Sequence, residues 1–188
     1  HPRSSAASDV YKRQVWSRLG MERLIRFLLA DVPVWTLAIA LLLGWIQTRR
    51  QWDVGRWAEA SLLWIAFWVL GVAGVYGFVC HLAFGPFIAE QIGWPNSPFQ
   101  NEVAYANLTI GILGLSSFFY RRHDYLLAAM VGYCSWFFAD GVGHVVSLLV
   151  SNDVAPSNAG SVLYTDLFTP VLVMLLLWLS RKQRCRLR

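Results

Sequence analysis

The sequence predicts an all-α integral membrane protein, a bundle of five transmembrane helices. The chain is 56% apolar and holds 10 Trp in 188 residues, which exceeds the usual content of soluble domains. Its apolar residues form five long runs, each near the ~20 residues that a helix needs to cross the hydrocarbon. Lys and Arg occur between alternate runs, as the positive-inside rule predicts.

The expected spans run without interruption and lack the period-two alternation of a membrane β-barrel. The first is the shortest, so the bundle has four transmembrane helices if that segment is interfacial. It lacks a small-residue cleavage pattern, and we therefore expect a retained span rather than a signal peptide. In chain order the expected spans are 32–47, 60–83, 103–120, 125–150 and 162–180.

The distribution of Lys and Arg orients the bundle in the membrane. The loops after the first and third spans are basic, as is the C-terminal tail, whereas loops 84–102 and 151–161 contain neither residue. This split predicts an N-terminus outside and a cytoplasmic C-terminus. Arg23 and Arg26 are exceptions, which Glu22 partly offsets.

Residues 1–20 are set apart from the rest of the chain. Residues 4–14 read SSAASDVYKRQ, which resembles a translated sequencing adapter. We interpret 1–20 as an artefact, the alternative being a disordered tail, and 21–188 as a single transmembrane helical domain. Residues 1–20 hold four basic residues and one acidic residue, so the remainder has 12 basic and 10 acidic residues. This near-neutral balance gives no reason to expect nucleic-acid binding.

The loop after the second span contains three prolines and the start of the third helix. We expect a short interfacial piece at 87–92 and a turn at 93–96. Ser97 is the expected N-cap, Pro98 suits the first helical position, and Gln100 is the expected partner of Ser97 in a capping box.

The stretch 92–102, IGWPNSPFQNE, carries a family resemblance together with Asn107 and Gly111. It resembles an uncharacterised family of small bacterial membrane proteins, known only as a domain of unknown function. His81 and the segment 140–144, DGVGH, extend the resemblance over 80–144. The resemblance implies a multi-pass protein of the bacterial inner membrane, and it implies no activity.

Ionisable residues inside a membrane are costly and usually face the bundle interior, so they are candidates for function. The predicted topology puts six of them at similar depth near the outer face, while their lateral arrangement does not follow from the sequence. His81, Glu102, Asp140 and His144 form the candidate polar site, with Ser97, Gln100, Asn107 and Asp166 in support and Asp31 at the same depth.

The fourth span carries two stripes at helical spacing. Asp140 and His144 form an i,i+4 pair on one stripe and can interact directly. The second stripe consists of small residues that suit close helix packing, with glycines of the second span as the expected counterpart. The small residues are Gly132, Ser135, Ala139 and Gly143, and the glycines are Gly71, Gly74 and Gly77.

Each polar group also has a structural explanation. Asp140 and His144 can satisfy one another inside the bundle, and Glu102 can stabilise a helix N-terminus. His81 and Asp166 can lie in the hydrated interface, where charge costs less than at the membrane centre.

Three functions remain open, and the sequence does not decide whether the protein is an enzyme. A membrane enzyme or redox protein would hold Zn²⁺ or Fe²⁺ on the four candidate residues, which are suitable ligand types. A small proton-coupled carrier would use them as a proton relay. A structural or accessory subunit would bind a partner helix or a second copy through the small-residue stripe. The isolated cysteines form no zinc-binding pattern.

Overall fold

The computed structural model describes residues 29–186, so the adapter-like residues 4–14 lie outside the described part. Contacts divide the chain between Val32 and Pro33. Every regular element in the described residues is helical, which confirms the predicted class.

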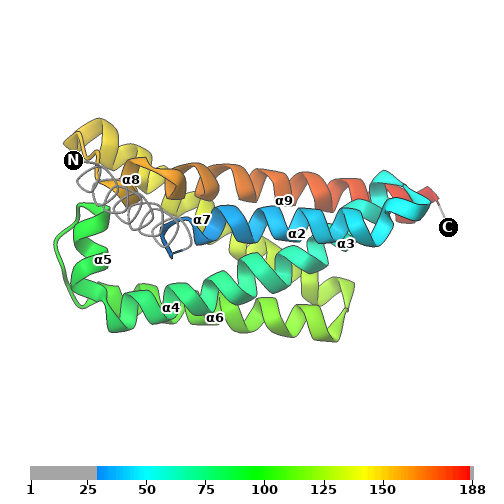
Figure 1. The fold of residues 1–188 in the computed structure, drawn as a ribbon, viewed down its shortest axis with the longest axis horizontal. Coiled ribbons are helices and arrows are strands. Elements are labelled where there is room, and N and C mark those ends of the chain that lie inside the picture. Colours follow the sequence, from blue (N-terminus) through cyan, green and yellow to red (C-terminus); the bar gives the residue numbers. More distant parts are fainter. Residues whose placement is uncertain (1–28, 187–188) are drawn as a thin grey trace, which may run out of the picture. The chain divides into compact units, whose positions relative to one another are not determined.

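Five segments are long and apolar enough to cross a membrane, and together they confirm the predicted number of spans. The first is Val32–Gln51, a helix whose C-terminal 3₁₀ turn makes it long enough to cross the membrane. Figure 1 shows the α-helices, coloured in chain order, and the full set of elements includes two further helical segments, η1 and η2. The elements are α2 (Val32–Thr48), η1 (Arg49–Gln51), α3 (Val54–Ile65), η2 (Ala66–Val72), α4 (Ala73–Ala83), α5 (Gly85–Ile92), α6 (Phe99–Tyr120), α7 (His123–Ser151), α8 (Pro156–Ala159) and α9 (Ser161–Arg186).

The second span is longer than hydropathy predicts because a side-chain cap starts it early. Asp53 Oδ1 accepts hydrogen bonds from the backbone N–H groups of Gly55 and Arg56, at 2.9 and 3.0 Å. α3 therefore begins at Val54, before the expected residue 60. The span continues through η2, a π-helical stretch, into α4.

α4 and α6 pack closely because glycines line their contact. A Cβ atom on Gly74 would lie 2.8 Å from the backbone nitrogen of Gly111. A Cβ on Gly77 would lie 2.7 Å from Oδ1 of Asn107. Backbone and side-chain atoms of α6 therefore occupy the space that a Cβ would need, and a larger residue would push the two helices apart. The two helices lie side by side in Figure 1.

The expected packing of the small-residue stripe on α7 is wrong. Gly132, Ser135 and Ala139 are exposed, and a Cβ on Gly132 or Gly143 would meet no described atom within 4 Å. The glycines of the second span pack against α6 instead. Helical spacing identifies residues that share a face, but it does not identify what covers that face.

α7, α9 and α3 form the rest of the bundle. α7 packs against α9, and α9 also packs against α3. The apolar cluster where these helices and η2 meet includes large side chains with at most 1% exposure, namely Leu62, Ile65, Leu70, Met130, Val173 and Leu176.

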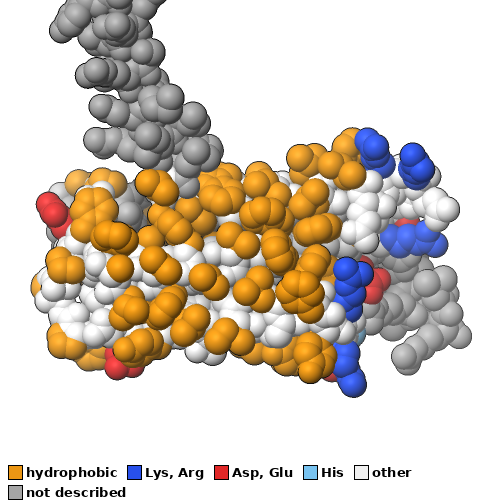
Figure 2. Space-filling model, turned by 60° about the horizontal axis from the view of Figure 1, so that its bottom comes forward, with side chains coloured by type: hydrophobic (Ala, Val, Ile, Leu, Met, Phe, Trp, Pro, Cys, Tyr) orange, Lys and Arg blue, Asp and Glu red, His pale blue; other side chains and the backbone are white. Residues whose placement is uncertain are grey.

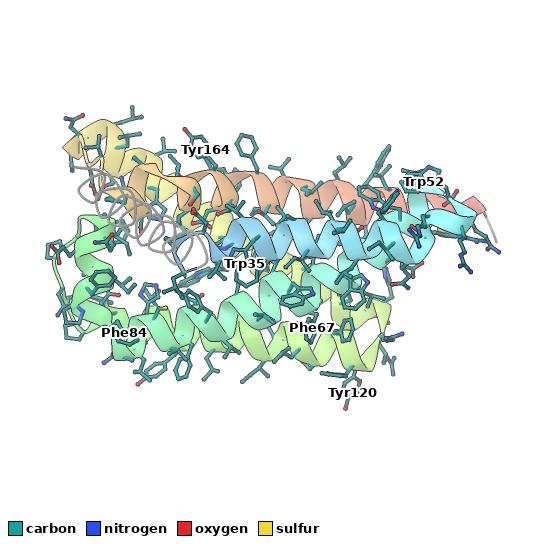
Figure 3. All side chains as sticks on the ribbon, in the orientation of Figure 1. Trp35, Trp52, Phe67, Phe84, Tyr120 and Tyr164 are labelled. Atoms are coloured by element: carbon teal, nitrogen blue, oxygen red, sulfur yellow. The ribbon has the colours of Figure 1, made fainter. Side chains whose placement is uncertain are left out.

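Positive charge lies at one end of the bundle. Figure 2 shows hydrophobic side chains along the visible face of the bundle, with the basic side chains of that face at one end. We call this the arginine end. Exposed Trp52 and Tyr120 lie near it in Figure 3, whereas exposed Phe84 lies toward the opposite end, beside α5. The described arginines lie at the ends of the first, third and fifth spans and at the start of the second: Arg49, Arg50, Arg56, Arg121, Arg122 and Arg181.

The connection between α4 and α6 forms as expected except at its capping box. The predicted interfacial piece at 87–92 forms part of helix α5, and this helix ends at Gly93, which has the left-handed conformation with φ 84°. α6, however, begins at Phe99 without a side-chain cap. The Gln100 backbone N–H bonds to the carbonyl of Ser97, while its side chain contacts His81. The predicted Ser97–Gln100 capping box is therefore wrong, because the Gln100 amide has a partner on α4.

Candidate functional site

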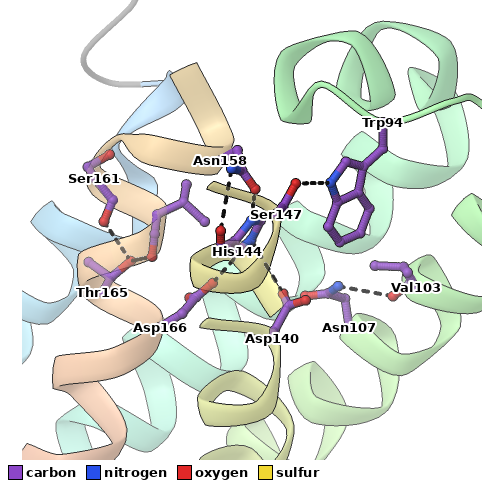
Figure 4. Close-up of polar contacts among 11 residues, drawn as sticks. Trp94, Val103, Asn107, Asp140, His144, Ser147, Asn158, Ser161, Thr165 and Asp166 are labelled. Atoms are coloured by element: carbon purple, nitrogen blue, oxygen red, sulfur yellow. Dashed lines mark hydrogen bonds and ion pairs between the residues drawn. The ribbon is translucent and has the colours of Figure 1, made fainter. Parts of the chain in front are cut away.

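One imidazole and two carboxylates meet near the α5–α8 end of the bundle (Figure 4). Asp140 and His144 come from α7 and Asp166 comes from α9. Nε2 of His144 lies 4.0 Å from Oδ2 of Asp140 and 3.9 Å from Oδ2 of Asp166. The three ligand atoms lie within 4.8 Å of one another, so they form a candidate metal centre.

Local structure explains why these three side chains meet. α7 is a regular helix here, so Asp140 and His144 project from one face, one turn apart. Gly141 allows α9 to approach that face. A Cβ at this position would lie 2.9 Å from Cδ2 of Leu167 and 3.2 Å from the carbonyl carbon of Asp166. A glycine between the two α7 ligands therefore brings the α9 ligand within reach.

The three side chains differ in exposure. Those of His144 and Asp166 are only 4% and 5% exposed, whereas that of Asp140 is 40% exposed. Oδ2 of Asp166 is buried and has no hydrogen-bond partner among the described residues. A buried, ionised carboxylate without a partner is strongly destabilising. The charge of this carboxylate can be balanced by a proton on the carboxyl group, by a proton on Nε2 of His144 at 3.9 Å, or by a metal cation.

Asn158 on α8 orients the ring of His144. Its Nδ2 donates to the backbone oxygens of Asp153 and His144, at 2.8 and 3.5 Å, which fixes the orientation of the amide. Its Oδ1 lies 2.8 Å from Nδ1 of His144 and accepts a hydrogen bond from it. Nδ1 therefore carries a proton, and Nε2 faces the two carboxylates. Protein metal sites commonly hold a ligating histidine in this way.

Two loops cover the centre from the α5–α8 end. Trp94 stacks on the His144 ring with centroids 5.7 Å apart and planes at 28°. Trp94 Nε1 donates to Oγ of Ser147 at 3.3 Å, and this hydroxyl donates to Oδ2 of Asp153 at 3.1 Å. Gly93 fits against Asp153, where a Cβ would lie 2.3 Å from Oδ1. These contacts join the α5–α6 loop to the α7–α8 loop.

The other residues predicted for the site, among them His81, Gln100, Asn107 and Glu102, are not members of the Asp140–His144–Asp166 group. Nδ1 of His81 lies 2.7 Å from Oε1 of Gln100, and His81 is within electrostatic range of Asp140. Asn107 is buried, and its Nδ2 donates to the carbonyl of Val103 at 3.0 Å. Glu102 is exposed on α6 and is not part of the Asp140–His144–Asp166 group.

Sequence reasoning missed Asn158 and the stacking role of Trp94. Asn158 is uncharged and lies in the four-residue helix α8, where no periodic pattern marks a buried face. Trp94 has the position of an interfacial anchor near a span end. Its place inside the stretch 92–102, which carries the family resemblance, was the available signal.

Comparison with protein families agrees with this resemblance. Residues 30–186 match the model of DUF6790, a family of unknown function. The chain belongs to this family. The match to DUF6790 includes all five spans and every residue of the candidate centre. Neither a curated protein nor a solved structure matches the chain.

Proposed function

We propose that this DUF6790 protein binds one divalent transition metal, Zn²⁺ or Fe²⁺, inside the membrane. Asp140, His144 and Asp166 supply the ligands. The observation that carries the proposal is the arrangement at His144, whose Nε2 faces two carboxylate oxygens at 3.9 and 4.0 Å while Nδ1 is held by Asn158.

Charge balance supports a divalent ion. With Nδ1 protonated and Nε2 bare, the imidazole is neutral and two ionised carboxylates give the group a charge of −2. A lone pair on Nε2 and the carboxylate oxygens repel one another unless a proton or a metal cation lies between them. A single M²⁺ ion neutralises the group and accepts all three donor atoms, which are suitable ligands for Zn²⁺ and Fe²⁺.

The distances fit such an ion after small movements. Donor atoms in a tetrahedral site with bonds of about 2.1 Å lie about 3.4 Å apart. The two separations from Nε2 are 3.9 and 4.0 Å, so each of these two pairs must approach by roughly half an ångström. The two carboxylate oxygens lie within 4.8 Å of one another, so they must approach by at most about 1.4 Å. Rotation of the half-exposed Asp140 side chain supplies part of this movement without repacking the buried core.

Three protein ligands leave at least one coordination position for water or substrate. Such an open site is typical of catalytic zinc, whereas structural zinc usually has four protein ligands. The proposal therefore favours an enzyme or redox protein over a purely structural subunit. The arginines at the opposite end orient the chain with the metal centre toward the outer face of the inner membrane.

A proton relay is the second candidate, and the same separations favour it. Distances of 3.9 and 4.0 Å exceed a direct hydrogen bond but suit transfer through a bridging water. In this case His144 and one carboxylate share protons, and the protein acts as a small proton-coupled carrier.

Metal analysis of the purified protein separates the candidates. We expect about one equivalent of Zn or Fe by elemental mass spectrometry after purification in detergent. His144→Gln and Asp166→Asn should lose it. Glu102→Gln, an exposed change on α6, is the matched control and should retain it. If folded wild-type protein neither contains a metal nor binds added Zn²⁺ or Fe²⁺, the metal proposal fails and the proton relay takes its place.

A further inference from the structure

A second polar site lies at the arginine end, remote from the metal centre. A pocket of about 190 Å³ is lined by Gln47, Thr48, Arg50, Gln51 and Arg56. These residues come from the end of α2, from η1 and from the first turns of α3. We propose that this pocket binds the phosphate of an anionic phospholipid headgroup.

The side chains present hydrogen-bond donors to the pocket. The side-chain oxygen Oε1 of Gln47 accepts a hydrogen bond from Nε1 of Trp64 at 3.0 Å, which leaves the side-chain NH₂ group of Gln47 as a donor. Nη1 of Arg56 donates to Oε1 of Gln51 at 2.9 Å, which likewise orients the Gln51 amino group away from that bond. Both interactions hold the amide oxygens in place, so the pocket offers N–H groups to an anion.

The pocket also keeps its positive charge. Arg50 and Arg56 form no ion pair with an Asp or Glu within the part of the chain that the structure describes. The carboxylate of Asp53, which lies between them in sequence, accepts instead from the backbone of Gly55 and Arg56. Two guanidinium groups with planar N–H donors are well suited to bind a phosphate.

The surroundings favour a lipid over a free phosphate ion. Trp45 and Trp52 are 45% and 57% exposed near the pocket, as expected for aromatic anchors at headgroup level. Leu42 and Ile46 are also exposed on α2, at 52% and 42%, and both precede the pocket residue Gln47 by less than two helical turns. A phosphate held by the arginines would therefore place its acyl chains along α2.

The pocket volume agrees with a headgroup. Sites that enclose a whole small molecule typically have about 300–1,000 Å³, which exceeds the 190 Å³ found here. The pocket accommodates a phosphate and its adjoining atoms while the rest of the lipid remains in the bilayer. The arginine end faces the cytoplasmic leaflet in the orientation proposed above, where anionic lipids are available.

Native mass spectrometry of the full chain tests the site. The protein is purified from nanodiscs of phosphatidylglycerol and phosphatidylcholine in equal amounts, and the lipid that stays bound is counted. We expect one phosphatidylglycerol per chain to survive washing. The double variant Arg50→Gln/Arg56→Gln should reduce its occupancy at least tenfold. The control Arg121→Gln/Arg122→Gln removes the same charge from another loop at the same end and should keep the lipid.

Several outcomes would overturn the proposal. Equal loss from both double variants would show diffuse attraction of anionic lipid to the arginine end. Equal retention of phosphatidylcholine, or displacement of the lipid by millimolar inorganic phosphate with the phosphate then bound, would exclude a lipid-specific site. Circular dichroism establishes that each variant is folded. If the double variant does not fold, Arg50→Gln and Arg56→Gln are tested singly, and unchanged occupancy in both contradicts the site.

Discussion

Nδ1 of His144 donates to Oδ1 of Asn158 over 2.8 Å, and this bond joins α7, a helix of 29 residues, to α8, a helix of four residues. The bond decides which imidazole nitrogen faces Asp140 and Asp166. Asn158 is wholly buried, at 0% exposure, and its amino group holds the backbone of the loop. A residue of the short helix α8 thus determines which ring nitrogen of the buried His144 is free to bind a metal ion or a proton.

Asn158→Leu should therefore weaken metal binding while leaving the three ligands in place. Loss of a partner that orients a ligating histidine typically costs about 10–100-fold in affinity. Asn158→Asp preserves an acceptor for Nδ1 and should retain more affinity than the leucine variant. Competition with a chromophoric zinc chelator measures both. Equal affinities for wild type and Asn158→Leu would contradict an orienting role.

Replacing glycines by alanine should distinguish helix faces that pack against another helix from faces that do not. Gly74→Ala places a Cβ 2.8 Å from the backbone of Gly111, so α4 and α6 must move apart. Overpacking of this kind costs about 1–3 kcal/mol. Gly132→Ala is the matched control, because its Cβ would meet no described atom within 4 Å. Thermal unfolding in detergent should show a lower midpoint for Gly74→Ala alone, and equal midpoints would argue against the close α4–α6 contact.

Helical periodicity and hydropathy were sufficient to predict the class, the five spans and the Asp140–His144 pair. Each depends on residues close in sequence, and α7 is regular where the pair lies. The third member of the group depends on which helix packs beside α7. The predicted depth in the membrane is similar for Glu102 and Asp166, so it does not show which of them joins Asp140 and His144. The packing of α7 against α9 places Asp166 there.

The remaining differences also arise from tertiary contacts. Gln100 has the local spacing of a capping-box residue, but a partner on α4 takes its side chain. The sequence prediction placed the start of the second span at its first long apolar run, so it missed Asp53, the polar N-cap that starts α3 several residues earlier. Asn158 is buried in a segment too short to show periodicity.

Membrane orientation should be visible by chemical labelling. In a background without the native cysteines, Asn96→Cys and Asn152→Cys should react with an impermeant thiol reagent added to the periplasmic side. Both residues are exposed, and they lie in the loops that lack Lys and Arg. Gln183→Cys, in the basic tail, should react only after the membrane is opened. Labelling of Gln183→Cys from outside would reverse the orientation proposed from the arginines.

The two candidate helix caps should respond differently to alanine. Asp53→Ala removes an acceptor for the N–H groups of Gly55 and Arg56, so it should cost about 1 kcal/mol, as loss of an N-cap typically does. Ser97→Ala should have little effect, because the Ser97 side chain has no hydrogen bond to the described start of α6. Asp53→Asn and Ser97→Asn serve as controls, since each keeps an acceptor at its position. Reversible unfolding in mixed micelles gives the free energies. A larger loss for Ser97→Ala than for Asp53→Ala would show that Ser97 caps α6 after all and would restore the capping box expected from the sequence.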